Sequence, residues 1–226
     1  MPAYDLAGSG CAGFVLGLDV ACARARWRGE RVLLIGVEVL SRMMDWQDRN
    51  VCVLFGDGAG AALLGPLDGR GGAEVLAVVA GTEGARADIL GLEVGGSRRP
   101  VTAEHVRDRR HLKIEMKGRE VFKEAVGRMS EASRAVLARA GLDLEDVALV
   151  VPHQANLRII RAVAKALGVP LGRVAVNVDR YGNTGSASIP LALAQARDEG
   201  RIQPGDAVLL TSFGAGFHWA AALLRF

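Results

Sequence analysis

The sequence contains few cysteines, and no two of them are closely spaced. Three cysteines occur among 226 residues, and no C-x-x-C motif is present. An odd number of cysteines without close pairing does not indicate a disulfide framework, and the missing C-x-x-C pairs give no sign of a zinc site. Because reduced thiols are typical of the cytoplasm, we predict a cytoplasmic protein without a bound metal.

Long apolar runs and dense positive charge are also missing. No apolar stretch approaches the roughly 20 residues that span a bilayer, and the N-terminus shows no basic region followed by an apolar run, the pattern of a signal peptide. The net charge is +3 with mixed signs along the chain, unlike the Lys- and Arg-rich stripe of a nucleic-acid-binding protein. We therefore predict no membrane partner and no nucleic-acid partner.

Apolar residues make up half of the chain, which is enough to build a buried core in one large or two small domains. Helical spacing of these residues predicts helices at 11–26, 118–140, 157–167 and 186–198. Strands are predicted at 3–6, 31–39, 74–80, 148–151, 174–178, 207–213 and 219–226, with two more joined at the glycines of 51–65. Strands that alternate with helices predict an α/β fold with largely parallel central strands.

One order of elements occurs twice. A turn of small residues, a helix, an apolar strand and a segment containing F-G-x-G follow each other in the first 65 residues and again after Gly182. Residues 66–72, PLDGRGG, predict a linker, so we expect one half at 1–68 and another at 69–226. The late copy has two helices and two strands ahead of its turn, whereas the early copy has ten residues ahead of Cys11. If the halves are duplicates, the first half lacks its opening strand–helix–strand unit.

Cys11 lies in the stretch DLAGSGCAGF, at the predicted start of a helix. Unpaired backbone N–H groups and the positive end of the helix dipole favour a thiolate there. The small neighbouring residues also let a substrate approach the sulfur closely. The alternative is a small, buried and inert cysteine, which this stretch alone favours.

Polar residues follow a predicted apolar strand in VVPHQANLRII. His153, Gln154 and Asn156 lie at the carboxyl end of this strand, where open parallel α/β sheets bind ligands. Histidine there donates hydrogen bonds or transfers protons near neutral pH. The alternative is structural and equally weighted: Asn156 caps the next helix, and His153 is a turn residue with satisfied hydrogen bonds.

Two further turns contain residues that suit an anionic intermediate. Asn183 lies between glycines in DRYGNTGSAS, where its amide can donate to a developing oxyanion; the alternative is a turn or cap residue. The glycines of SFGAGFHWA, around Ala215, are able to present backbone N–H groups to the same point. FGDGAG at 55–60 is superficially similar to a phosphate loop, but strand-like residues follow it, so we interpret it as a structural hairpin.

Together these motifs resemble β-ketoacyl-acyl-carrier-protein synthase III, of the thiolase superfamily. The segments that carry the resemblance are CAGF, DWQDRNVCVLFGDGAGAALLG, MKGREVFK, VPHQANLRII, VDRYGNTGSASIPLAL and SFGAGFHWAAALLRF. The resemblance covers nearly the whole chain and implies duplicated α/β halves in a layered αβαβα arrangement. It also implies that the first half is incomplete, with on the order of a hundred residues absent before Pro2.

The resemblance implies a role for each motif. Cys11 takes an acyl group from an acyl-CoA, and His153 and Asn183 stabilise the enolate formed when a malonyl thioester loses carbon dioxide. The backbone N–H groups of Cys11 and Ala215 form the oxyanion hole, although the family usually has glycine where Ala215 stands. No cofactor is needed, because acyl-CoA and malonyl carrier protein are substrates.

The resemblance also implies partners. Arg49 and Asn156 are candidate CoA-binding residues. One face of the helix after HQAN presents three cations at i, i+3 and i+7, which suits an acidic acyl carrier protein, or is a solvated charged face: Arg158, Arg161 and Lys165. The complete enzyme is expected to be a homodimer that starts fatty acid synthesis.

Two other functions remain open. One is a related acyltransferase or condensing enzyme of secondary metabolism that uses the same cysteine, histidine and asparagine. The other is a truncated chain that folds but has no catalytic activity. The coding sequence upstream of Met1 shows most directly whether the chain is truncated, because it would encode the missing opening unit of the first half.

Overall fold

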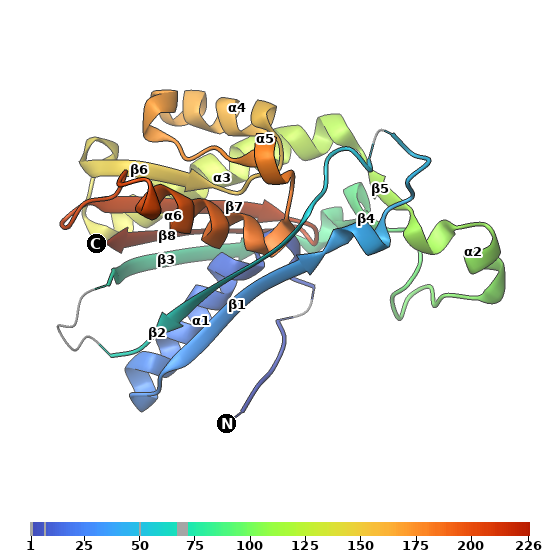
Figure 1. Cartoon of the computed structure of the whole chain (residues 1–226), viewed down its shortest axis with the longest axis horizontal. Helices are drawn as coiled ribbons and strands as arrows, with labels where there is room; N and C mark the ends of the chain where they lie inside the picture. Colours follow the sequence, from blue (N-terminus) through green and yellow to red (C-terminus); the bar gives the residue numbers. More distant parts are fainter. Residues whose placement is uncertain (1, 7, 50, 67–71) are drawn as a thin grey trace.

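The computed structural model describes residues 2–6, 8–49, 51–66 and 72–226 (Figure 1). The helices are α1 (Gly13–Arg28), α2 (Ala103–Arg107), α3 (Gly118–Ala140), α4 (Leu157–Leu167), α5 (Val178–Tyr181) and α6 (Ser188–Asp198). The strands are β1 (Val32–Val39), β2 (Asp57–Leu64), β3 (Glu74–Thr82), β4 (Leu90–Leu92), β5 (Ile114–Met116), β6 (Val147–Pro152), β7 (Ala207–Gly214) and β8 (His218–Arg225). The predicted boundary near residue 68 and most of the predicted linker lie outside the described residues.

The main sheet has the strand order β3-β8-β7-β6, and two small antiparallel sheets are formed by β1 with β2 and by β4 with β5. Within the main sheet only β6 and β7 run parallel, because helices connect them, whereas a tight turn joins β7 to β8 and makes that pair antiparallel. The α/β class is confirmed. The expectation of largely parallel central strands is wrong for the main sheet, because β8 pairs antiparallel with both β3 and β7; it holds for β6 with β7 and for an isolated parallel bridge between Val150 and Val174.

Helices cover both faces of the main sheet. On one face α3 and α4 bury a cluster that includes Met129, Val163 and Leu209. On the other face α1 and α6 bury a second cluster that includes Phe14, Ile189 and Leu210. The β1–β2 sheet then lies against α1 and α6 on their far side (Figure 1). Over the described residues, four of the five layers that the resemblance implies are present, in the order helices, sheet, helices, sheet.

The repeat predicted from the sequence is present as two helix–strand–strand units. Helix α1 is followed by the antiparallel pair β1 and β2, as α6 is followed by the antiparallel pair β7 and β8. Their strands differ in burial. Every residue of β7 is buried, whereas Leu33, Ile35 and Val37 of β1 are more than half exposed. The apolar strand predicted at 31–39 is therefore not buried on the outer face of β1, while its alternate residues point inward to α1 and to the turn before α6.

Glycines let β1 and β2 approach the second half of the chain. A Cβ atom on Gly56 would lie 2.0 Å from the carbonyl oxygen of Tyr181, and one on Gly36 would lie 2.7 Å from that of Ser186. Gly58 and Gly60 contact α6 and the turn before it in the same way. Residues 51–65 were predicted as two strands joined at these glycines. They form turns followed by one strand, because the glycines serve close packing rather than a hairpin.

Two other predicted strands are not formed. Residues 3–6 run without strand pairing. Of 174–178, Val174 forms the single bridge to Val150, and Val178 already begins α5. An apolar run becomes a strand only where a neighbour supplies backbone partners, and sequence periodicity carries no information about that neighbour.

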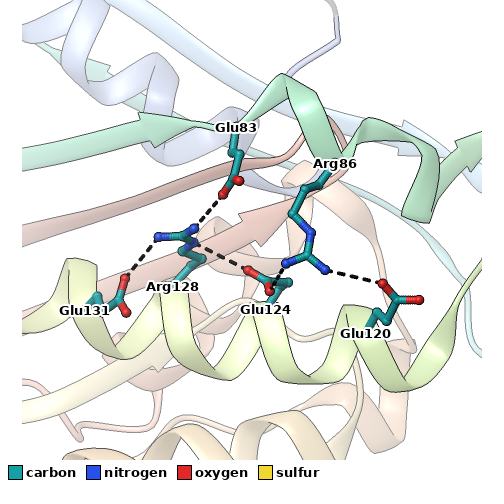
Figure 2. Close-up of polar contacts among 6 residues, drawn as sticks. All are labelled: Glu83, Arg86, Glu120, Glu124, Arg128 and Glu131. Carbon is teal, nitrogen blue, oxygen red and sulfur yellow. Dashed lines mark hydrogen bonds and ion pairs between the residues drawn. The ribbon is translucent and has the colours of Figure 1, made fainter.

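A network of ion pairs ties α3 to the segment after β3 (Figure 2). Arg128 forms ion pairs with three glutamates: Glu83 at 2.5 Å, Glu124 at 3.6 Å and Glu131 at 3.3 Å. Its guanidinium also lies 4.6 Å from the ring centroid of Trp219, as a cation–π contact. Arg86 pairs with Glu124 at 2.6 Å and Glu120 at 3.3 Å. The backbone of Glu83 in turn exchanges two hydrogen bonds with Phe217, next to the β7–β8 turn. The network therefore braces the segment that supports this turn.

We predict that Arg128→Met lowers the free energy of unfolding by about 1–2 kcal/mol, because a partly buried ion-pair network and a cation–π contact are lost together. Chemical denaturation at low and high ionic strength measures this loss, which salt should reduce. Arg197→Met is the matched control, since Arg197 pairs only with its exposed neighbour Asp198 among the described residues. Equal effects of the two substitutions at low salt would contradict the prediction.

Candidate active site

Five residues predicted from four separate motifs line one cavity of about 1220 Å³. They are Cys11, His153, Asn156, Asn183 and Ala215. Cys11 precedes α1, His153 follows β6, and Asn183 lies between α5 and α6. The fold thus brings together residues that are far apart in the chain, such as Cys11 and Asn183, which are separated by 172 positions.

Cys11 lies in a 3-10 turn, Gly10–Ala12, directly before α1. Its Sγ atom is 4.0 Å from Oδ1 of Asn183. Burial, followed by the negative charge of Glu38, raises the pKa of the Cys11 thiol to about 12. The prediction that the helix start favours a thiolate is therefore wrong for the resting protein, because the loss of hydration outweighs the helix dipole.

His153 is buried and held at two points. Its backbone N–H donates to the carbonyl oxygen of Thr211 at 2.8 Å, and its Nδ1 lies 2.6 Å from Oγ of Ser188. Burial lowers the pKa of His153 to about 4, so the imidazole is neutral at neutral pH. Oγ of Ser188 also accepts the backbone N–H of Gln154 at 3.4 Å, which leaves its hydroxyl hydrogen for Nδ1. This arrangement favours the tautomer with its proton on Nε2.

Ser188 is a residue that the sequence analysis missed. It is the first residue of α6 and is buried, whereas its surroundings in GNTGSAS suggested only a small-residue turn. Gln154, which the same analysis considered a ligand-binding candidate, has a structural role: its side chain donates to the carbonyl oxygens of Pro152 and Ala175 and accepts the backbone N–H of Asn177. It thereby supports the turn that presents His153.

Asn183 is held by the first half of the chain. Its backbone N–H donates to the carbonyl oxygen of Leu54 at 2.8 Å, and its carbonyl oxygen accepts the N–H of Gly56 at 3.0 Å. Its side-chain Oδ1 accepts the N–H of Gly185 at 2.9 Å. Left-handed backbone is adopted by the flanking glycines, Gly182 and Gly185, and not by Asn183. The amide Nδ2 is thus left to donate to a ligand.

The β7–β8 turn approaches Cys11 through its backbone. A Cβ atom on Gly214 would lie 2.7 Å from the backbone nitrogen of Cys11, and one on Gly10 would lie 3.3 Å from that of Ala215. The two backbone nitrogens predicted to form an oxyanion hole are consequently on segments in direct contact. The methyl group of Ala215 leaves this approach intact, because the close contacts are made by Gly214 and Gly10.

The remaining predicted residues divide into three groups. Asn156 caps α4 by accepting the N–H of Ile159 at 2.9 Å and also lines the cavity, so both interpretations of it are compatible with the structure. Arg49 lies in an exposed turn and is not among the cavity-lining residues. The three cations of α4 are exposed, and over the described residues none forms an ion pair: Arg158, Arg161 and Lys165.

The site combines a neutral thiol with donors aimed at one space. The thiol of Cys11 is a nucleophile once its proton is removed. The Nε2–H of His153 and the Nδ2–H of Asn183 are neutral donors suited to a developing oxyanion, as they carry no charge that water exclusion would penalise. Such a set fits acyl transfer to sulfur followed by chemistry through an enolate.

Comparison with known proteins agrees with this geometry. The family described as 3-oxoacyl-[acyl-carrier-protein (ACP)] synthase III matches residues 4–84, and its C-terminal family matches residues 137–226. The β-ketoacyl-[acyl-carrier-protein] synthase III of Roseiflexus castenholzii is 49% identical over 99% of this chain and 67% of its own length.

Solved structures give the same result. The β-ketoacyl-[acyl carrier protein] synthase III of Thermus thermophilus has a TM-score of 0.85 at 47% identity, over 96% of this chain and 66% of that chain. The priming β-ketosynthase of the R1128 polyketide biosynthetic pathway has a TM-score of 0.80 at 38% identity, over 96% and 64%. The chain spans about two thirds of the length of these relatives. It belongs to the 3-oxoacyl-(acyl-carrier-protein) synthase III family.

Proposed function

We propose that this protein is a β-ketoacyl-acyl-carrier-protein synthase III, an acyltransferase that condenses an acyl-CoA primer with malonyl carrier protein at the start of fatty acid synthesis. The observation that carries the proposal is the convergence of Cys11, His153 and Asn183 on one cavity, with Cys11 Sγ 4.0 Å from Asn183 Oδ1. Membership of the family supports the same reaction.

In the first half-reaction the sulfur of Cys11 attacks the thioester carbonyl of acyl-CoA. A carbon–sulfur bond forms to Cys11, the thiol proton leaves, and the bond to the CoA sulfur breaks, so that CoA departs as its thiol. The developing oxyanion is stabilised by the backbone N–H groups of Cys11 and Ala215.

In the second half-reaction the malonyl thioester oxygen accepts hydrogen bonds from Nε2 of His153 and Nδ2 of Asn183. The bond to the carboxylate carbon breaks, carbon dioxide leaves, and the electron pair forms an enolate. The enolate carbon attacks the thioester on Cys11, and the sulfur of Cys11 leaves as a thiolate that takes up a proton from water. The product is a β-ketoacyl carrier protein. Ser188 keeps Nε2 of His153 protonated throughout.

We also propose which residues bind CoA and the carrier protein. Asn156 contacts CoA at the cavity wall, and Arg49 binds CoA only if the ligand extends beyond the lining residues. Arg158, Arg161 and Lys165 bind the acidic carrier protein. The three cysteines are free, which suits the proposed cytoplasmic location; homodimeric assembly is proposed from family membership alone. Over the described residues, no helix has the length and apolar character needed to cross a membrane.

A second candidate is a priming ketosynthase of secondary metabolism. The observation that favours it is the structural likeness to the priming β-ketosynthase of a polyketide pathway at 38% identity. The two candidates share the chemistry above and differ in the acyl primer. Turnover with a panel of acyl-CoA primers separates them: preference for a primer that fatty acid synthesis does not use supports the second.

We predict that Cys11 is the acylated residue. Incubation with isotopically labelled acetyl-CoA, followed by peptide mass spectrometry, should place the label on Cys11, and Cys22→Ser should label to the same extent. Alkylation of Cys11 by iodoacetamide should accelerate with pH throughout the range from 7 to about 10, because the neutral thiol is favoured below its raised pKa. A rate that is already maximal near pH 7 would show that a thiolate is present at rest.

We predict that His153→Ala and Asn183→Ala separate the two half-reactions. Each should lower decarboxylation of malonyl carrier protein by a factor on the order of 100, because one oxyanion donor is lost, while acylation of Cys11 remains measurable. His105→Gln, on the distant helix α2, is the control. Equal loss of both half-reactions would instead indicate that His153 chiefly activates the thiol.

We predict that Arg158→Glu weakens binding of malonyl carrier protein more than binding of malonyl-CoA. The loss should be largest at low ionic strength, since exposed charges act over a screened range of about 10 Å. Arg197→Glu makes the same charge change on α6 and should have little effect. If both malonyl substrates weaken equally, Arg158 belongs to the CoA site or to a solvated face.

A further inference from the structure

Glu38 connects the two halves of the chain beside the candidate site. It lies on the inward face of β1, one residue from the end of that strand. Its Oε1 accepts the backbone N–H of Ser186 at 3.2 Å and the hydroxyl of Ser186 at 3.0 Å. One carboxylate oxygen thus receives two hydrogen bonds from a turn 148 residues away.

The same carboxylate lies directly over Gly185. A Cβ atom at Gly185 would be 2.6 Å from Cγ and 2.7 Å from Oε1 of Glu38. Gly185 adopts a left-handed conformation (φ +54°), and its N–H donates to Oδ1 of Asn183. A chain of contacts therefore runs from Glu38 through Ser186 and Gly185 to the side chain of Asn183, and from there to the sulfur of Cys11.

Glu38 also contributes charge to the cavity. It is among the cavity-lining residues, together with Cys11 and Asn183. Its negative charge is the second cause, after burial, that raises the pKa of the Cys11 thiol. Of the described residues, it is the one charged side chain that contributes to this effect. The carboxylate of Glu38 therefore both accepts the hydrogen bonds of the Ser186 turn and places a negative charge at the cavity that contains Cys11.

We propose that Glu38 is a positioning residue: its carboxylate fixes the Gly185–Ser186 turn so that the side chain of Asn183 faces Cys11, and its charge lies in the same cavity as the Cys11 sulfur. The positioning part acts on the condensation step and rests on the function proposed above. The electrostatic part has a separate consequence. A neutral thiol reacts slowly with oxidants and alkylating agents, so Cys11 is protected until an acyl donor enters.

Two substitutions separate these parts. Glu38→Gln keeps a side-chain oxygen that accepts both hydrogen bonds from Ser186 and removes the charge. Glu38→Ala removes both. Asp198→Asn is the matched control, because it neutralises an exposed carboxylate at the end of α6. Ser186→Ala keeps the charge and removes one of the two hydrogen bonds.

The first measurement is hydrogen exchange of peptides that contain residues 183–187. Losing hydrogen bonds to a charged acceptor raises exchange of this segment by about tenfold in Glu38→Ala. Glu38→Gln and Asp198→Asn should stay close to the unmodified protein, and Ser186→Ala should lie between. Unchanged exchange in Glu38→Ala, or equal increases in Glu38→Gln and Glu38→Ala, would overturn the positioning role.

The second measurement is the pH profile of iodoacetamide alkylation at Cys11, followed by mass spectrometry. Removing the charge should shift the profile to lower pH in Glu38→Gln and Glu38→Ala but not in Ser186→Ala or Asp198→Asn. A structural defect alone would not produce this division. An unshifted profile in Glu38→Gln would overturn the electrostatic role. If Glu38→Ala fails to fold, Glu38→Gln and Ser186→Ala still decide both roles.

The third measurement is decarboxylation of malonyl carrier protein, compared with acylation of Cys11. Glu38→Ala should lower decarboxylation by about tenfold and leave acylation measurable, and Glu38→Gln should restore most of the loss. If the unmodified protein does not decarboxylate the substrate, the proposed function fails, while exchange and alkylation still test Glu38. Equal loss of decarboxylation in both variants would overturn the positioning role.

Discussion

The site depends on a close backbone approach between the β1–β2 sheet and the segment that contains Asn183. Gly36 and Gly56 allow this contact, since any Cβ atom there would meet a backbone carbonyl. Through it the backbone of residues 54–56 pairs with Asn183, and Glu38 reaches Ser186. Because neither half holds Asn183 by itself, the geometry around Cys11 is a property of the interface between the halves.

The second determinant is the exclusion of water. Burial raises the pKa of Cys11 and lowers that of His153, so the pair is a thiol and a neutral imidazole at neutral pH. A neutral imidazole is a donor to an enolate, whereas an imidazolium–thiolate pair would be suited to activating the thiol at rest. The same burial makes stability depend on pH: the free energy of unfolding should fall as the pH drops below about 6.5, because His153 then binds a proton in the unfolded chain but not in the folded one.

The sequence identifies the reactive residues of this site better than the residues that hold them in place. Cys11 stands out by its small neighbours, His153 by its place at the end of an apolar strand and Asn183 by its place between glycines, and their order resembles a known family. Ser188 and Glu38 carry no such signal, since a serine after glycines and a glutamate in an apolar strand are common and their partners are 35 and 148 residues away. For the same reason the strand at 3–6 was predicted wrongly: pairing depends on neighbours that local sequence does not identify.

The most direct test of the central claim is the fate of the malonyl carboxylate. The protein is given acetyl-CoA and malonyl carrier protein labelled with ¹³C at the free carboxyl carbon, and labelled carbon dioxide is measured beside the carrier-bound product. The account predicts one labelled carbon dioxide for each β-ketoacyl carrier protein formed, with an acetyl-Cys11 intermediate. Malonyl carrier protein that keeps its label while Cys11 is fully acylated would contradict the claim that Cys11, His153 and Asn183 form one condensing site.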